Sequence, residues 1–231
     1  MKTKTIRELV DYLSTFQSPE RRNKMDEVLR MRTRFITVVL ENIYQPHNAN
    51  AVIRTCELLG IQDVHIIEKD NKFNVSKDVS VGSAGWIDIH RYEDAENEPD
   101  SRCFENLREY GYRIIAASPD KSAKPLGSLK IDRKLAVVFG TEESGLSDFV
   151  MENSDDVVSI PMYGFTASYN LSVACAIVLR ELGEKMRKSN IDWQLTEEEA
   201  LNLKYSWLLN SVKNSDLLLK RYIAEHDIEL P

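Results

Sequence analysis

The stretch FITVVLENIYQPHNANAVIRTCELLGIQDVHII, residues 35–67, decides the fold class of this chain. It opens with the β-branched apolar run 35–40, which is typical of a strand buried on both faces. A polar loop leads into a helical apolar pattern, with Asn48 as the expected N-cap and Gly60 as the expected end. Residues 64–67 form the next strand candidate. A strand, a helix and a second strand predict an α/β domain with a mostly parallel sheet and helices on both faces.

The alternation continues toward the C-terminus, after a polar and irregular segment at 70–98. The further elements expected from apolar runs and helical spacing are strands at 113–118, 134–140 and 157–162, a short helix within 142–153, and longer helices at 99–111 and 168–188. In such a sheet, ligands gather at the loops that follow the carboxyl ends of the strands. We therefore search those loops for functional residues.

Helical patterns flank this central region on both sides. Residues 1–34 predict two helices, with a break and a new helix start at Ser18-Pro19-Glu20. Residues 190–195 are typical of a linker, and 196–226 predict a long helix. We expect three segments: an N-terminal helical extension at 1–34, the α/β domain at 35–189, and a C-terminal helical extension at 190–231.

The composition limits the class of protein. The chain has 231 residues, of which 42% are hydrophobic and 29% charged, and this suits a water-soluble domain with a substantial core. No apolar run is long enough to span a membrane, and the N-terminus lacks the pattern of a signal peptide. The three cysteines are far apart and form no CxxC pair, so neither a disulfide nor a metal site is predicted. We expect a cytoplasmic protein without a membrane partner.

The charge is unevenly distributed along the chain. The net charge is −7, which alone argues against a nucleic-acid partner. Residues 1–34, however, hold nine basic and five acidic residues, so this segment carries +4 and the remainder −11. A basic arm on an acidic body can mark contact with a polyanion, whereas a solvated amphipathic helix would explain the same pattern.

Three loop segments combine residue types that could carry chemistry. QPHNANAVIRTCE (45–57) places a polar loop before a helix that carries Arg54, although an ordinary turn with an exposed arginine would look the same. In FGTEESGLS (139–147), Gly140 permits close approach to the backbone and Gly145 a positive φ, or the segment is a plain strand-to-helix turn. Its two acidic residues disfavour a phosphate and suit a neutral or cationic adenosyl group. The third segment, IPMYGFTASYNLSVACAI (160–177), places small polar residues at a helix start, where they could bind an anion or serve only as a cap.

Taken together and in this order, the three segments resemble the signature motifs of SPOUT-class (SpoU/TrmH family) RNA 2′-O-ribose methyltransferases. They are most similar to the TrmH-type tRNA guanosine 2′-O-methyltransferases, over residues 28–188. The resemblance implies a deep C-terminal trefoil knot, a homodimer with its active site at the subunit interface, and S-adenosyl-L-methionine bound in the knot loops. The positions that match the family's cofactor contacts are Ala117, Gly140, Gly145, Ile160, Met162, Tyr169 and Leu171.

The resemblance also implies roles for five site residues. Arg54 matches the residue that activates the ribose 2′-hydroxyl, and Asn48 matches one that supports it. Ser168 and Asn170 match residues that hold phosphate and order the active-site loop, and Glu142 matches a carboxylate of the second motif. A guanidinium has a pKa above about 12, so a phosphate grip and stabilisation of the developing alkoxide suit Arg54 better than a base role. Basic residues expected to contact the RNA backbone are Arg30, Arg32 and Arg34.

The chain departs from the TrmH pattern at several positions. Gln45 replaces a usual lysine, the third motif has GFTASYN for the common GMVQSLN, and Glu184 interrupts a basic run. The expected function is methyl transfer to a ribose 2′-hydroxyl of tRNA, at a guanosine of the D-loop, with no DNA partner. The alternatives are a ribosomal-RNA 2′-O-methyltransferase and a non-catalytic RNA-binding module with a vestigial cofactor pocket.

Overall fold

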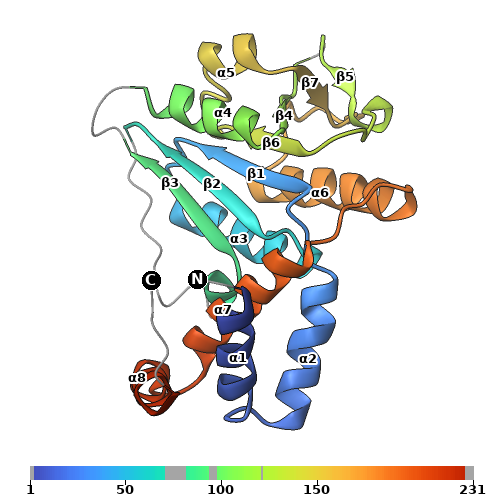
Figure 1. Cartoon of the computed structure of the whole chain (residues 1–231). Coiled ribbons are helices and arrows are strands. Elements are labelled where there is room, and N and C mark those ends of the chain that lie inside the picture. Colours follow the sequence, from blue (N-terminus) through green and yellow to red (C-terminus); the bar gives the residue numbers. More distant parts are fainter. Residues whose placement is uncertain (1–2, 71–81, 94–97, 121, 227–231) are drawn as a thin grey trace. The chain divides into compact units, whose positions relative to one another are not determined.

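The computed structural model describes residues 3–70, 82–93, 98–120 and 122–226 (Figure 1). The chain divides into two compact units, Thr33–Trp193 and a helical unit made of Met1–Arg32 with Gln194–Pro231. The expected segment boundaries lie close to these, but the two terminal extensions belong to one unit. Parts of the segment 70–98, namely 71–81 and 94–97, lie outside the described residues.

The unit Thr33–Trp193 is built on seven parallel strands in the order β3-β2-β1-β6-β4-β7-β5. The strands are β1 (Ile36–Glu41), β2 (Asp63–Glu68), β3 (Asp88–Glu93), β4 (Arg113–Ala117), β5 (Lys124–Pro125), β6 (Leu135–Phe139) and β7 (Asp156–Ser159). The helices are α3 (Pro46–Leu59), α4 (Pro99–Glu109), α5 (Asp148–Asn153) and α6 (Leu171–Lys188), with short 3-10 turns η1 (Ser83–Trp86) and η2 (Leu126–Ser128). The predicted parallel α/β fold is confirmed.

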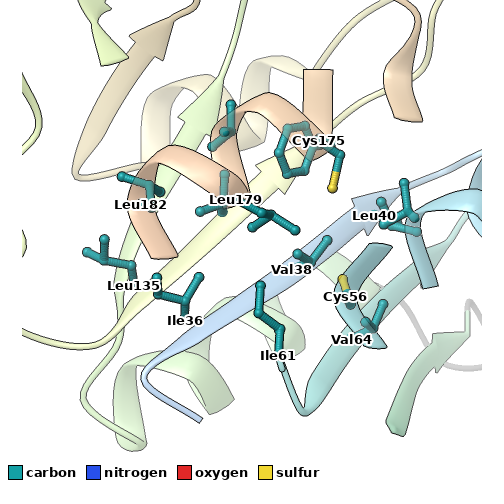
Figure 2. Packing of buried hydrophobic residues seen from close by; sticks show 14 of the residues in the cluster. Ile36, Val38, Leu40, Cys56, Ile61, Val64, Leu135, Cys175, Leu179 and Leu182 are labelled. Atoms are coloured by element: carbon teal, nitrogen blue, oxygen red, sulfur yellow. The ribbon is translucent and has the colours of Figure 1, made fainter. Parts of the chain in front are cut away.

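The sheet is covered by helices on both faces. In β1, Ile36, Val38 and Leu40 point toward one apolar cluster, which includes Cys56 of α3 and Leu179 of α6 (Figure 2). Alternate residues point the other way, into a second cluster formed with α4 and α5. Both faces of the central strands are therefore dry, which explains why their sequences are continuous apolar runs rather than alternating ones.

The start of one helix differs from the sequence expectation. Helix α3 begins at Pro46 with Gln45 at the N-cap position, so Asn48 lies in the first turn and is not the cap. Proline is favoured as the first helical residue because its missing N–H would be unpaired there in any case. The expected end of α3 at Gly60 is confirmed, with a left-handed φ of 77°.

The helical unit contains α1 (Thr3–Ser14), α2 (Pro19–Arg30), α7 (Glu197–Ser211) and α8 (Ser215–His226). The single helix expected at 196–226 is thus two helices, and Asn214, with a φ of 58°, lies at the break. Thr196 and Glu199 form a reciprocal capping box at the start of α7. Within the described residues, none of the helices combines the length and apolar character needed to cross a bilayer.

Candidate active site

A cavity of about 560 Å³ lies at the carboxyl ends of β4, β6 and β7. All seven positions expected to contact a cofactor line this cavity: Ala117, Gly140, Gly145, Ile160, Met162, Tyr169 and Leu171. Glu142 and Ser168 line it as well. The resemblance therefore points to residues that the fold brings together from three loops, far apart in the sequence.

The loop after β6 is folded tightly onto itself. The backbone groups of Thr141 and Gly145 exchange two hydrogen bonds of 3.0 and 3.1 Å, and Gly145 adopts the expected positive φ, 72°. A Cβ atom on Gly140 would lie 2.1 Å from the Gly145 carbonyl oxygen. Glycine is required at 140 because the chain itself passes so close to this position. Because the chain turns back between Thr141 and Gly145, the backbone of the loop forms part of the cavity wall.

Asn170 joins the three sequence motifs. Its Oδ1 accepts hydrogen bonds from the Ser172 backbone N–H (3.0 Å) and hydroxyl (2.6 Å), so it caps α6. Its Nδ2 donates to Glu142 Oε1 at 2.5 Å and to Asn48 Oδ1 at 3.3 Å. The Leu171 N–H also donates to Glu142 Oε1, at 3.3 Å. One amide thus holds the second motif, the first motif and the helix start in a fixed arrangement.

Asn48 extends this network into the first turn of α3. Asn48 is 3% exposed, and its Nδ2 donates a hydrogen bond to Gln45 Oε1 at 3.1 Å. From the sequence, Gln45 was only a departure from the TrmH pattern. The contact between Gln45 and Asn48 was not predicted. The segment Ser118–Asp120, which also lines the cavity, was missed too. Its position directly after the carboxyl end of β4 was the available signal.

Arg54 lies apart from this network. Its side chain is exposed on α3, and it is not among the residues that line the cavity. In the described part of the chain, Arg54 makes no hydrogen bond or ion pair. The structure of one chain therefore brings Asn48, Glu142 and Asn170 together, but it does not bring Arg54 to them.

The three arginines expected at the RNA differ in their surroundings. Arg30 is exposed. Arg32 is fully buried, with its guanidinium carbon 5.3 Å from the Trp207 ring, so the expectation that it contacts RNA is corrected. Arg34 forms ion pairs with Asp63 and Asp88. Burial acts to lower the pKa of Arg34, but these two carboxylates outweigh burial and raise it. Its charge is therefore already balanced inside the protein.

The three cysteines lie in the core and do not line the cavity. The three cysteines, Cys56, Cys103 and Cys175, are buried free thiols, and burial raises the pKa of Cys103 and Cys175. Among the residues that the structure describes, no group of three or more His, Cys, Asp or Glu side chains is placed to hold a metal ion. The candidate chemistry therefore rests on the cavity and on the Asn170 network.

Known proteins share both the sequence pattern and the fold. Residues 35–180 match the SpoU rRNA Methylase family. A Borreliella burgdorferi protein named tRNA (guanosine(18)-2'-O)-methyltransferase is 44% identical over 205 residues, which make up 89% of this chain and 92% of that protein. A Thermus thermophilus protein of the same name is 31% identical over 74% of this chain and 86% of its own length.

A similar fold has also been solved. The A. aeolicus TrmH/SpoU tRNA modifying enzyme superposes with a TM-score of 0.72 and 26% identity, over 84% of this chain and 98% of that one. The sequence match at 35–180 falls within Thr33–Trp193, the unit that holds the cavity.

Proposed function

Since this chain belongs to the SpoU methylase family, we propose that it methylates the ribose 2′-hydroxyl of a tRNA guanosine in the D-loop, with S-adenosyl-L-methionine as methyl donor. The observation that carries the proposal is the junction of Asn48, Glu142 and Asn170 beside a cavity lined by the Gly140–Gly145 loop. We propose guanosine as the target nucleoside because two relatives are named for guanosine 18. Action on tRNA also implies a cytoplasmic protein.

The lining of the cavity fits an adenosyl sulfonium compound. Apolar side chains such as Leu146, Val158 and Met162 suit an adenine ring. The carboxylates Asp120, Glu142 and Glu143 suit a positively charged group and would repel a nucleotide phosphate. When bound, S-adenosylmethionine supplies a methyl group on a positively charged sulfur.

The protein residues then have to align the 2′-hydroxyl and manage its proton. We assign to Arg54 the binding of the target phosphate and the stabilisation of negative charge on the 2′-oxygen. A guanidinium is a poor general base, so the hydroxyl proton passes to phosphate or water. Ser168 and Asn170 stand at the N-terminus of the 18-residue helix α6, where the helix dipole favours an anion such as phosphate.

We further propose that the active site is completed by a second copy of the chain. Arg54 is exposed and does not line the cavity of its own subunit. In the segment that leads to α6, Tyr163 is 96% exposed and Phe165 is fully exposed. Large exposed aromatic side chains next to an active site favour burial in a subunit interface. A homodimer would bring Arg54 of one subunit to the cavity of the other. The trefoil knot, too, remains an expectation of the family.

The test is methylation of unmodified tRNA with isotope-labelled S-adenosylmethionine, followed by nucleoside mass spectrometry. We expect label in 2′-O-methylguanosine from the D-loop, and no label when Asn170 is replaced by alanine. Label in ribosomal RNA alone would overturn the tRNA assignment. Failure to bind S-adenosylhomocysteine in calorimetry would support a non-catalytic RNA-binding module instead.

A further inference from the structure

Glu41, the last residue of β1, is a buried carboxylate with no role in the chemistry above. It is 3% exposed, and burying a charged carboxylate is costly unless its oxygens are paired. Both oxygens are paired. Oε1 accepts a hydrogen bond from Lys69 Nζ at 3.1 Å, and Oε2 accepts one from the backbone N–H of Ser147 at 3.0 Å. The second bond joins residues 106 positions apart in the sequence.

Ser147 marks the end of the cavity loop. It follows Leu146 directly and forms the N-cap of α5, where its hydroxyl accepts from the Val150 N–H. Strands β1 and β6 are neighbours, with Leu40 opposite Phe139, so Glu41 lies beside the point where the loop leaves β6. The loop 140–146 is therefore held by β6 at its start and by the Glu41 carboxylate at its end.

The charge of Glu41 is balanced by a cation that has a second partner. Lys69 also forms an ion pair with Asp100, which is 6% exposed. Burial acts to lower the pKa of Lys69, but Asp100 and Glu41 outweigh it and raise that pKa, so the lysine stays charged. Removing the Glu41 carboxylate would thus leave Lys69 paired with Asp100, while the Ser147 N–H would lose its acceptor.

We propose that Glu41 is a positioning residue of the cofactor site, acting through Ser147 to hold the loop 140–146 in its binding geometry. This inference rests on the proposed function, because it assigns the loop to an adenosyl cofactor. A loop that is already ordered loses less conformational entropy when it binds a ligand. The same loop carries Glu142, which accepts a hydrogen bond from the Asn170 amide.

The test compares S-adenosylhomocysteine affinity, measured by calorimetry, with thermal stability in four variants. Glu41→Gln keeps an oxygen that can accept from the Ser147 N–H, so its Kd should stay within about threefold of wild type. Glu41→Met is similar in size but has no acceptor, and its Kd should rise about tenfold or more. Glu41→Asp keeps the charge but is one methylene shorter, and its Kd should also rise about tenfold.

Asp63→Asn is the matched control. Asp63 is likewise a buried carboxylate, paired with Arg34 and His90, but it lies at the amino end of β2, whereas the cavity lies at the carboxyl ends of the strands. This variant should lower the melting temperature and leave the Kd within about twofold of wild type.

Wild-type affinity in both Glu41→Met and Glu41→Asp would overturn the inference, as would an equal loss of affinity in Asp63→Asn. Glu41→Met and Glu41→Asp are independent tests of the same contact: if Glu41→Met fails to fold, Glu41→Asp gives the answer. A wild-type protein that does not bind S-adenosylhomocysteine would overturn the proposed function itself, which is a different result.

Discussion

At the scale of single residues, Asn170 is the position where capping and the active site can be separated. Asn170→Asp keeps an oxygen that accepts from the first N–H groups of α6, but it cannot donate to Glu142 or Asn48. The new carboxylate also faces Glu142 and repels it. We expect a nearly unchanged melting temperature and a loss of methyl transfer of about 10- to 100-fold, from the value of a hydrogen bond to a charged group. Full activity in the labelled-tRNA assay would contradict the role of the amide.

Because His65 is buried, we expect the free energy of unfolding to fall in mild acid. Burial, and next the charge of His90, lower the pKa of His65 to about 4, against an ordinary value of 6.5. The unfolded chain therefore binds more protons between pH 4 and 6.5, so stability is complete above 6.5 and is lost as the pH falls toward 4. The loss attributable to His65 is about 3 kcal/mol. Denaturant unfolding across this pH range measures it.

His65→Phe is the control for that prediction. Phenylalanine keeps a flat ring that can stack on His90, whose ring centroid lies 4.6 Å from that of His65. The other groups near His65 are Tyr92, Asp63 and Arg34. The pKa of Asp63 is lowered by His90 and Arg34 against the effect of burial, so its contribution is lost at lower pH, below its ordinary pKa of 3.8. In this variant the free energy of unfolding should not fall between pH 6.5 and 4. An unchanged fall would show that another group causes it.

At the scale of elements, the loop after β6 depends on one missing side chain. Gly140→Ala would force a Cβ to within 2.1 Å of the Gly145 carbonyl, so the loop backbone would have to move. We expect S-adenosylhomocysteine affinity to fall at least about tenfold. Gly85→Ala is the matched control, because a Cβ there meets nothing within 4 Å, and its affinity should equal that of wild type. Equal affinities for both variants would show that the loop tolerates the change.

Elements with a strong local pattern were predictable, and elements fixed by distant contacts were not. The buried strands β1 and β6 have continuous apolar sequences, because both of their faces are covered. The strand β3, DIHRYE, lies at the edge of the sheet and has one buried residue, so its sequence resembles a polar loop. The break between α7 and α8 was missed because Asn214, not a glycine or proline, adopts the positive φ there.

The candidate site was predictable where motifs fix backbone geometry and unpredictable where charge alone was the signal. The glycine loop and the cap at Asn170 lie where the motifs place them. Arg32 is buried against an indole, and Arg34 is paired with two carboxylates. A run of basic residues in a sequence does not tell which of them the fold uses internally, because their partners come from distant segments.

At the scale of the whole molecule, the terminal extensions form one unit rather than two. In that unit Lys204 of α7 pairs with Asp26 of α2 at 2.5 Å, and Gln17 donates to Ser211 at 3.2 Å. Arg30, the exposed member of the three arginines, belongs to this unit. We expect Arg30→Ala to weaken tRNA binding several-fold. We also expect it to reduce the slope of log affinity against log salt concentration by about one. An unchanged slope in a filter-binding assay would remove Arg30 from the RNA contact.

A homodimeric active site can be tested by mixing inactive subunits. Arg54→Ala and Asn170→Ala should each abolish most methyl transfer, because each removes one half of every site. If Arg54 serves the cavity of the other subunit, a mixed dimer holds one intact site and one doubly damaged site. Subunits that are mixed one to one and allowed to exchange should then recover roughly a quarter of wild-type activity. Recovery should be lost at dilutions where the dimer dissociates. No recovery from dimers proven to exchange would place Arg54 at the cavity of its own subunit, because every mixed dimer would then hold two damaged sites.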